Sequence, residues 1–535
     1  MAQPGSVLEW GSSGRGFKSH RSDKTYKVPC VPFLLYKINS LSIMNNFTDK
    51  PKEYCGIFGI FKSQNAAVNT YYGLHALQHR GQEASGIVTN SLNENGKSVF
   101  NIFKGFGLVN EVFADAKIFD EHLQGFSAIG HNRYSTTGSS ESKKNIQPFL
   151  VNYRMGNLAV AHNGNLTNAK KLRDELVEDG SIFQTTSDSE VILHLIAKSR
   201  YEKQIDQVKE ALSKIEGAYC FVILTDDKLI AARDPYGFRP LCIGKYNGSY
   251  IIASETCALD ILGAEYVRDV LPGEIVVIDD EVLKTKVIKS CFFAEKRDAK
   301  HCIFEYIYFS RPDSKIFGTS VDKIRRKLGK VLADKYEVRD PDGEKVIVIS
   351  VPDSSNTAAI GYQNQLDKKG IPSKLEIGLI RSHYIGRTFI LPGQQKREIG
   401  VRIKFNTVKG VLENKTVVLI DDSIVRGTTS KQLISLIREA KPKSIHFRVS
   451  SAPILFPCYY GMDFPSKDEL IANIYNNNVN RIAEYLGVDS LAYMTIDDML
   501  EAMVDHNKCD FCTACFSGIY PTIIDNNFNK LQNEV

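Results

Sequence analysis

The sequence predicts an α/β protein with two architectures: an α+β first half, in which sheets pack against helices, and a second half built on a parallel sheet. In the first half, short apolar segments separated by Gly, Asn and Asp turns outnumber segments with helical periodicity. In the second half, apolar segment, polar turn and helix succeed one another, as in parallel α/β sheets. The chain has 535 residues, 43% hydrophobic and 24% charged, which suits a globular protein with at least two cores.

The elements of the first half follow in chain order. Apolar segments predict strands at 55–61, 126–135, 158–164, 218–226 and 250–256. Apolar residues at three- and four-residue spacing predict helices at 69–81 and 189–199.

Two continuous apolar segments in the second half, 345–350 and 416–423, predict buried strands. A polar turn follows each strand, and the second turn leads into a helix at 431–440. Ligands of parallel sheets bind beyond the carboxyl ends of the strands, so both turns are candidate binding sites.

Composition excludes several classes of protein. The 67 basic and 62 acidic residues leave a net charge of +5, too small for this length to indicate nucleic-acid binding. No apolar run approaches the roughly 18 residues of a membrane helix. Eleven cysteines are too few for a disulfide scaffold. We therefore expect a cytoplasmic protein with neither nucleic acid nor membrane as a partner.

Residues 1–54 do not have the pattern of a folded domain. They are rich in serine and hold eight basic but four acidic residues, with no sustained periodicity. This composition suits an organelle transit peptide, which would place the protein in a compartment such as a plastid. An unstructured tail, or a start assigned upstream of Met44, is the alternative.

The segment VLIDDSIVRGTTS (418–430) carries the chemistry of the second half. Asp421 and Asp422 follow the expected strand, and their carboxylates suit ribose hydroxyls or a hydrated Mg²⁺ carried by a substrate. A helix then opens with Gly427, Thr428, Thr429 and Ser430. Free backbone N–H groups, a glycine and hydroxyls at a helix start form a cradle for phosphate.

This segment resembles the phosphoribosyl diphosphate (PRPP) motif of type I phosphoribosyltransferases. The resemblance makes 351–355 the pyrophosphate loop, with Ser354 at the position associated with Mg²⁺, and 378–390 a flexible loop that closes over the substrate. The implied PRPP-binding residues are Asp353, Ser354, Ser355, Asp421, Asp422, Ser423, Arg426, Gly427, Thr428, Thr429 and Ser430, with Ser354, Asp421 and Asp422 at Mg²⁺. The implied flexible-loop residues are Arg381, Tyr384 and Arg387, where Arg381-Ser382 departs from the usual Lys-Asn.

Four segments of the first half together predict acyl-transfer chemistry. Cys55 begins an apolar strand and can act as a nucleophile. Arg133 and Asp188 can clamp the carboxylate and the ammonium of an amino acid. The Asn163 side chain and the Gly164 backbone N–H can form an oxyanion hole.

The order and spacing of these segments resemble class II glutamine amidotransferases, which have the N-terminal-nucleophile fold, an αββα sandwich. The resemblance implies that Cys55 is the nucleophile and the first residue of the mature chain, with its own α-amine as the base. Cleavage between Tyr54 and Cys55 would then remove the leader. The other implied roles are Arg133 and Asp188 for glutamine and Asn163 with Gly164 for the oxyanion.

Three cysteines near the end of the chain read C-x-x-C-x-x-C: Cys509, Cys512 and Cys515. In a reducing compartment this spacing suggests Zn²⁺ or an iron–sulfur cluster, and few histidines stand nearby to complete a zinc finger. The alternative is a chance group of surface cysteines.

Both halves together, over about residues 55–525, resemble the amidophosphoribosyltransferase family. The members of this family that bear a [4Fe–4S] cluster have four cysteine ligands, which match Cys302, Cys458, Cys512 and Cys515 here. Cys509 is then a spare cysteine. The implied organisation is a leader or propeptide (1–54), a glutamine amidotransferase domain (55–290), a phosphoribosyltransferase domain (291–500) and a cluster-bearing tail (501–535).

The resemblance also implies an activity. Glutamine is hydrolysed to ammonia, and ammonia displaces pyrophosphate from C1 of PRPP to give 5-phosphoribosylamine, the first committed step of purine synthesis. Purine nucleotides as feedback inhibitors and a homo-oligomer, either tetramer or dimer, are further implications. Two alternatives are another class II amidotransferase, such as a hexosamine-phosphate synthase, and a non-catalytic sensor of PRPP or nucleotides.

Overall fold

The structure is a computed structural model that describes residues 55–134, 142–382, 402, 404–464 and 466–524. The expected leader, residues 1–54, lies outside the described residues. None of the helices in the described ranges combines the length and apolar composition needed to cross a membrane. The domain boundaries given above stay a prediction.

The first sheet of the N-terminal half is antiparallel and runs in the order β11-β9-β10-β1-β4-β2-β3. Its strands are β1 (Gly56–Phe61), β2 (Ala84–Leu92), β3 (Ser98–Phe106), β4 (Ser127–Arg133), β9 (Cys242–Tyr246), β10 (Ser249–Ala253) and β11 (Glu265–Asp269). Strand β1 lies inside the sheet and is buried along its whole length, which explains its nearly continuous apolar sequence.

The second sheet is also antiparallel, in the order β13-β12-β8-β7-β6-β5. Its strands are β5 (Phe149–Tyr153), β6 (Gly156–Leu166), β7 (Gly217–Thr225), β8 (Leu229–Arg233), β12 (Glu274–Ile278) and β13 (Lys289–Phe292). A core of alternate side chains from the two sheets, among them Ile129 and Val222, lies between them. The sheets therefore pack face to face.

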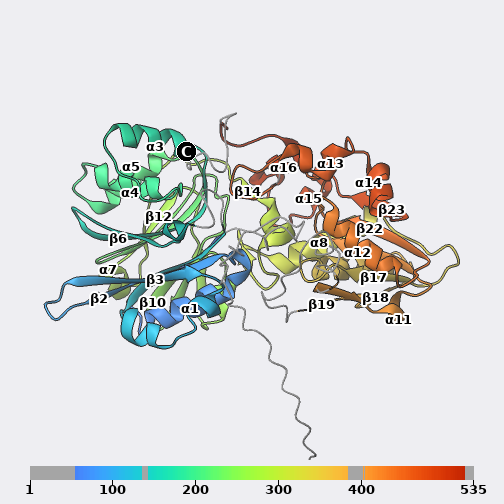
Figure 1. The fold of residues 1–535 in the computed structure, drawn as a ribbon, viewed down its shortest axis with the longest axis horizontal. Coiled ribbons are helices and arrows are strands. Elements are labelled where there is room, and N and C mark those ends of the chain that lie inside the picture. The colour runs from blue at the N-terminus through green and yellow to red at the C-terminus, as the bar shows by residue number, and fades with distance from the viewer. Residues whose placement is uncertain (1–54, 135–141, 383–401, 403, 465, 525–535) are drawn as a thin grey trace, which may run out of the picture. The chain divides into compact units, whose positions relative to one another are not determined.

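Helices cover the outer face of each sheet. Three helices, α3 (Ala169–Glu178), α4 (Glu190–Lys198) and α5 (Gln204–Lys214), pack on the sheet that holds β6. Helices α1 (Ala66–Ala76) and α6 (Cys257–Asp260) pack on the sheet that holds β1. Figure 1 shows the layers in turn, from α3, α4 and α5 through β6 and β3 to α1. The expected αββα sandwich is confirmed.

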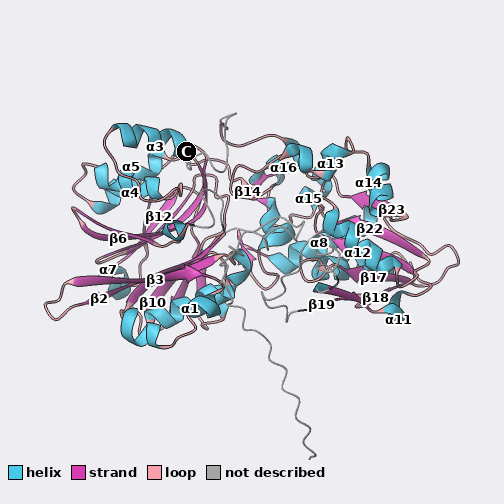
Figure 2. Ribbon diagram, viewed as in Figure 1, coloured by secondary structure: helices cyan, strands magenta, loops and turns pink. Residues whose placement is uncertain are grey.

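The C-terminal half is built on a parallel sheet in the order β18-β17-β21-β22-β23. Its strands are β17 (Val346–Ser350), β18 (Ser373–Leu375), β21 (Thr416–Asp421), β22 (Ser444–Val449) and β23 (Ser490–Tyr493). Helices α8 (Val321–Lys335) and α9 (Asn356–Lys368) cover one face, and α12 (Thr428–Arg438) and α14 (Val479–Leu486) cover the other. Figure 2 shows α8 and α12 beside this sheet. The predicted parallel α/β sheet is confirmed.

Two predicted helices differ from the structure at their ends. The helix expected at 69–81 begins earlier and stops at Ala76, and a single 3₁₀ turn, η2 (Gln78–Arg80), follows it. The helix expected at 431–440 begins at Thr428, directly after Gly427 in left-handed conformation (φ 78°). Glycine adopts this left-handed conformation without strain, and a Cβ at residue 427 would also displace the end of the Ile471 side chain, 2.3 Å away.

Candidate active sites

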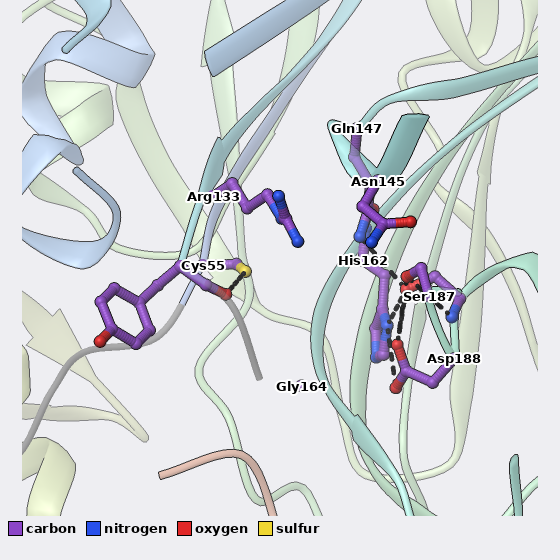
Figure 3. Close-up of a pocket in the computed structure, with 10 residues that line it drawn as sticks. Cys55, Arg133, Asn145, Gln147, His162, Gly164, Ser187 and Asp188 are labelled. Carbon is purple, nitrogen blue, oxygen red and sulfur yellow. Dashed lines mark hydrogen bonds and ion pairs between the residues drawn. The ribbon is translucent and has the colours of Figure 1, made fainter. Parts of the chain in front are cut away.

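A pocket in the N-terminal half collects residues from the start of β1, the end of β4, strand β6 and the loop before α4. Its lining consists of Cys55, Arg133, Tyr134, Asn145, Gln147, His162, Gly164, Ser187, Asp188 and Ser189. Figure 3 shows Cys55 and Arg133 on one side of the pocket and His162, Ser187 and Asp188 on the other. The structure thus brings together Cys55, Arg133, Gly164 and Asp188 of the predicted set.

The register of β1 against β4 places the nucleophile candidate beside the arginine. Gly56 pairs with Asn132, so Cys55 and Arg133 lie at the same end of adjacent strands. The Cys55 side chain is buried, and its Sγ donates to the carbonyl oxygen of Tyr134 at 3.4 Å. Burial raises the pKa of this thiol to about 11, although the Tyr134 contact and the Arg133 charge oppose the increase.

Asp188 is fixed by hydrogen bonds from its neighbours. Its Oδ2 accepts from the backbone N–H of Leu166 at 2.9 Å, and its Oδ1 accepts from the Ser189 hydroxyl at 3.1 Å. His162 Nδ1 lies 2.7 Å from the same hydroxyl and 3.9 Å from Asp188 Oδ2. Burial lowers the pKa of His162, which favours the neutral imidazole beside the Asp188 carboxylate.

The two oxyanion-hole candidates are consecutive residues of β6. Gly164 has φ 148°, and a Cβ there would meet the carbonyl oxygen of Ala218 at 2.0 Å, so only glycine fits. The Asn163 side chain is fully buried, and neither its nitrogen nor its oxygen has a hydrogen-bond partner among the described residues. Asn163, unlike Gly164, is not among the residues that line the pocket, and its part in an oxyanion hole stays a prediction.

The second candidate site lies at the carboxyl ends of β17 and β21. Ser350 pairs with Ile420, so the segments that follow the two strands begin side by side. The Ser354 hydroxyl donates to Asp422 Oδ2 at 2.5 Å, and the Ser355 hydroxyl donates to Asp421 Oδ1 at 3.1 Å. The residues predicted to bind PRPP at 353–355 and at 421–423 are therefore in direct contact.

The donor set of this site suits a hard cation. Both Asp421 and Asp422 are almost fully buried, and the Ser423 hydroxyl donates to Asp422 Oδ1 at 2.8 Å. Carboxylate and hydroxyl oxygens are the ligand types of Mg²⁺. Helices α9 and α12 begin beside them, at Asn356 and Thr428, and direct backbone N–H groups to this edge of the sheet.

Four of the predicted residues are placed away from the paired carboxylates or lie outside the described residues. The Arg426 side chain pairs with Glu469 at 3.0 Å on the surface. Arg381, on β19 (Leu379–Arg381), is half-exposed and pairs with Asp353 at 3.2 Å, which connects the expected flexible loop to the pyrophosphate loop. Tyr384 and Arg387 lie outside the described residues.

The four cysteines predicted to hold a cluster come together from three segments. Cys302 and Cys512 are register partners in the parallel pair β14 (His301–Cys302) and β24 (Phe511–Cys512). Cys302 and Cys458 pack against the apolar core that contains Cys515, and none of the four forms a disulfide. Cys509 is exposed, whereas Cys515 is buried.

A single metal ion and an iron–sulfur cluster require different spacings of their ligands. Within the described ranges, no three His, Cys, Asp or Glu side chains converge as the ligands of one ion. A four-iron cluster instead takes one thiolate at each of four corners and so spaces its cysteines more widely. Cys458 and Cys512 pack against Phe238 and Tyr460, and thiolates are the ligand type that iron–sulfur clusters use.

Sequence reasoning missed several residues that line the first pocket. His162 directly precedes the predicted Asn163, and Ser187 and Ser189 lie on either side of the predicted Asp188. The sequence motifs that predicted Asn163 and Asp188 therefore also contain these three pocket residues. Asn145 and Gln147 lie in a segment with no recognised motif. Only the folding of that loop against β6, where the Gln147 side chain accepts from the His162 backbone N–H at 2.7 Å, brings it to the site.

Comparisons with known proteins identify the family of this chain. The model of a family described as a glutamine amidotransferase domain matches residues 131–260. The chain is 49% identical to amidophosphoribosyltransferase 1, chloroplastic, of Arabidopsis thaliana, over 88% of this chain and 79% of that protein. It is 46% identical to amidophosphoribosyltransferase of Bacillus subtilis, over 88% of this chain and 95% of that protein.

A solved structure gives the same result at the level of the fold. The glutamine PRPP amidotransferase from B. subtilis, complexed with ADP and GMP, superposes with a TM-score of 0.80 and 44% identity. The superposition covers 89% of this chain and 100% of that chain. The chain therefore belongs to the amidophosphoribosyltransferase family.

Proposed function

We propose that the two sites carry the two halves of the amidophosphoribosyltransferase reaction, with the roles given below. Family membership makes the chain a glycosyltransferase with glutamine amidotransferase activity, which acts in the first step of purine biosynthesis. The observation that supports the assignment of roles is the pocket that holds Cys55, Arg133, Gly164 and Asp188 together.

In the first site, Arg133 binds the carboxylate of glutamine and Asp188 binds its ammonium group. The Cys55 thiolate attacks the carboxamide carbon, ammonia leaves, and water resolves the thioester to glutamate. Donors from Asn163 and Gly164 stabilise the oxyanion of each tetrahedral intermediate.

In the second site, ammonia displaces pyrophosphate from C1 of PRPP and forms 5-phosphoribosylamine. The N-terminus of α12 binds the 5-phosphate, and loop residues 353–355 bind the pyrophosphate. Asp421 and Asp422 bind the ribose hydroxyls or the hydrated Mg²⁺ that accompanies PRPP, and Ser354 contributes a further oxygen. Positioning and charge stabilisation, rather than covalent chemistry, supply the catalysis here.

The test of the function uses the purified protein with glutamine, PRPP and Mg²⁺. We expect glutamate and pyrophosphate to be released together, and pyrophosphate release to continue when ammonia replaces glutamine. Absence of PRPP-dependent pyrophosphate release with either nitrogen source would contradict the assignment. Glutamine hydrolysis without any use of PRPP would instead favour a different class II amidotransferase.

The pKa of the Cys55 thiol also predicts how glutamine hydrolysis at the first site depends on pH. With a pKa of about 11, only about one thiol in 10⁴ is ionised at pH 7, so the nucleophile needs a base. An α-amine on Cys55, with an ordinary pKa of about 8, supplies that base only after residues 1–54 are removed. We expect kcat/KM for glutamine to rise with pH and level off near pH 8 in protein whose intact mass begins at Cys55.

The chain that retains its leader is the control for this pH profile. Its glutaminase activity should be low at neutral pH and continue to rise toward pH 11, because the thiol must then ionise unaided. Equal activity of the long and the shortened chain at pH 7.5 would contradict the proposal that Cys55 must be the first residue.

We further propose that Cys302, Cys458, Cys512 and Cys515 hold a [4Fe–4S] cluster. Anaerobically purified protein should contain iron and sulfide and show broad visible absorbance. Cys512→Ser should remove both, since Cys512 is the register partner of Cys302, whereas Cys509→Ser should keep them because Cys509 is exposed. Colourless, iron-free and fully active wild-type protein would contradict the cluster.

The proposal also covers the regulation of the enzyme, its oligomeric state and its location in the cell. The B. subtilis structure named above was solved with ADP and GMP, which supports purine nucleotides as inhibitors here. A homo-oligomer, dimer or tetramer, is proposed from the family resemblance. The chloroplastic names of the Arabidopsis relatives support a role of residues 1–54 in targeting to an organelle, with the cytoplasm as the alternative location.

A further inference from the structure

Gln147 lines the first pocket but has no part in the mechanism proposed for it. Strand β5 pairs with β6 so that Phe149 lies opposite Val160. The same register, continued by two residues, sets Gln147 opposite His162. The Gln147 side chain acts there as a strand partner, because its Oε1 accepts from the backbone N–H of His162 at 2.7 Å. A backbone N–H can only donate, so this bond also fixes which end of the amide is Oε1 and which is Nε2.

The backbone around Gln147 is held by the first sheet. Lys104, on β3, donates from Nζ to the carbonyl oxygen of Ile146 at 2.6 Å. A Cβ at Gly86, on β2, would lie 2.3 Å from the carbonyl oxygen of Gln147, so the two backbones are in close contact. The Gln147 side chain therefore extends from a fixed backbone at the first sheet to β6 of the second sheet.

The other end of the Gln147 amide contacts Ser189. Its Nε2 donates to Ser189 Oγ at 3.2 Å, and both side chains are buried. The Ser189 hydroxyl donates its single hydrogen to Asp188 Oδ1 at 3.1 Å. Its two lone pairs are then left for Gln147 Nε2 and for His162 Nδ1, which lies 2.7 Å away. Hydrogen bonds thus run in one direction, from the backbone of β6 through Gln147 and Ser189 to the carboxylate of Asp188. Figure 3 shows Gln147 and Asp188 on the same side of the pocket.

We propose that Gln147 is a positioning residue for the ammonium group of glutamine and acts through Ser189 on the Asp188 carboxylate. The other oxygen of this carboxylate, Oδ2, accepts from the backbone N–H of Leu166 at 2.9 Å. With a donor at each oxygen, the carboxylate keeps one orientation and retains lone pairs for an ammonium ion. The inference rests on the proposed function, since it assumes that Asp188 binds the ammonium group.

Loss of this chain of hydrogen bonds should affect only the substrate group that Asp188 binds. The ammonium group takes no part in the bond changes, so its contacts stabilise the bound substrate and the transition state equally. Weaker binding of this group raises KM for glutamine and leaves kcat nearly unchanged. Glutaramate, which is glutamine without its amino group, has no ammonium for Asp188 to bind, so its affinity should not change.

The experiment compares KM for glutamine with Ki of glutaramate as a competitive inhibitor of glutamine hydrolysis. Gln147→Met keeps the length of the side chain but removes both of its hydrogen-bonding groups, and KM for glutamine should rise about tenfold. We expect kcat and Ki of glutaramate to stay within about twofold of wild type. A parallel rise of KM and Ki would mean general damage to the pocket and would overturn the inference, as would an unchanged KM.

Gln207→Met is the matched control. Gln207, on α5, is fully buried and does not line the pocket. It also uses both ends of its amide: Oε1 accepts from the Tyr153 hydroxyl at 3.0 Å, and Nε2 donates to the carbonyl oxygen of Tyr201 at 2.7 Å. This substitution should lower the melting temperature and leave KM for glutamine unchanged. A similar rise of KM in the control would show a general loss of stability and would contradict the positioning role.

A second variant decides the question if Gln147→Met does not fold. Ser189→Ala keeps the Gln147 amide on β6 and removes only the hydroxyl between that amide and Asp188. We expect a similar rise of KM for glutamine with Ki of glutaramate unchanged, and an unchanged KM would overturn the inference. Where both single variants fold, the double variant should be no worse than the weaker binder of the two, because both substitutions break the same chain.

Asp188→Asn distinguishes failure of this inference from failure of the proposed function. It should raise KM for glutamine more than either variant of the chain and leave Ki of glutaramate unchanged. An unchanged KM in Asp188→Asn would contradict the role of Asp188 in the proposed function. A raised KM in Asp188→Asn, together with an unchanged KM in Gln147→Met and Ser189→Ala, would overturn only the positioning role.

Discussion

Cys55→Ser should abolish glutamine-dependent synthesis while synthesis from ammonia continues. The serine hydroxyl fits the same space but ionises far less readily than a thiol, so the attack on the carboxamide fails. We expect the glutamine-dependent kcat to fall by at least about 10³-fold, as for the loss of other catalytic nucleophiles. The ammonia-dependent rate should remain within about twofold of wild type, because the second site does not use this thiol. Pyrophosphate release with each nitrogen source is the measurement.

Cys242→Ser is the matched control for this substitution. Cys242 is as buried as Cys55, and its Sγ donates to the carbonyl oxygen of Ala253 at 3.3 Å, as Cys55 does to Tyr134 at 3.4 Å. A general effect of replacing a buried thiol by a hydroxyl would appear in both variants. Retained glutamine-dependent synthesis in Cys55→Ser would show that the nucleophile is another residue.

The two sites differ in how much of each the sequence could predict. The second site is largely continuous: residues 353–355 and 421–423 each follow a strand, and parallel pairing of β17 with β21 brings them together. Its exception is Arg426, which pairs with Glu469, a residue more than 40 positions further along the chain. The motif gives no information on such a distant charge.

The first site depends more on tertiary structure. Cys55 and Arg133 were predictable because each lies at the end of an apolar strand. Asn145 and Gln147 were not, because their loop has no periodicity and is held to β6 by the Gln147 side chain. The predicted end of helix α1 lies five residues too late, at 81 instead of Ala76, because His79 and Arg80 continue the helical pattern of the sequence. In the structure, ion pairs to Glu255 and Glu305 hold these two residues in a tighter turn.

Asp422→Asn should impair synthesis with both nitrogen sources. The Asp422 carboxylate accepts hydrogen bonds from Ser354 and Ser423, so it organises both loops at the carboxyl edge of the sheet as well as binding the substrate. Asparagine keeps the shape but removes the charge that suits Mg²⁺, and its amide nitrogen cannot accept from a hydroxyl. We expect kcat/KM for PRPP to fall about 10²- to 10³-fold with glutamine or ammonia, measured as pyrophosphate release. Glutamine hydrolysis without PRPP should be unchanged.

Asp340→Asn is the control for Asp422→Asn. It distinguishes a specific loss of PRPP use from the general effect of losing a buried carboxylate. Asp340 is also buried, and its carboxylate accepts from the hydroxyl of Thr416 at 2.5 Å, at the opposite end of the strand that leads to Asp422. The two substitutions therefore remove the same charge from the two ends of β21, and only one end faces the proposed PRPP site. Asp340→Asn should lower the melting temperature and leave kcat/KM for PRPP nearly unchanged. If Asp422→Asn lost only stability, as the control does, then the paired carboxylates would belong to the framework of the sheet, and the phosphates would have to be bound by the helix N-terminus without them.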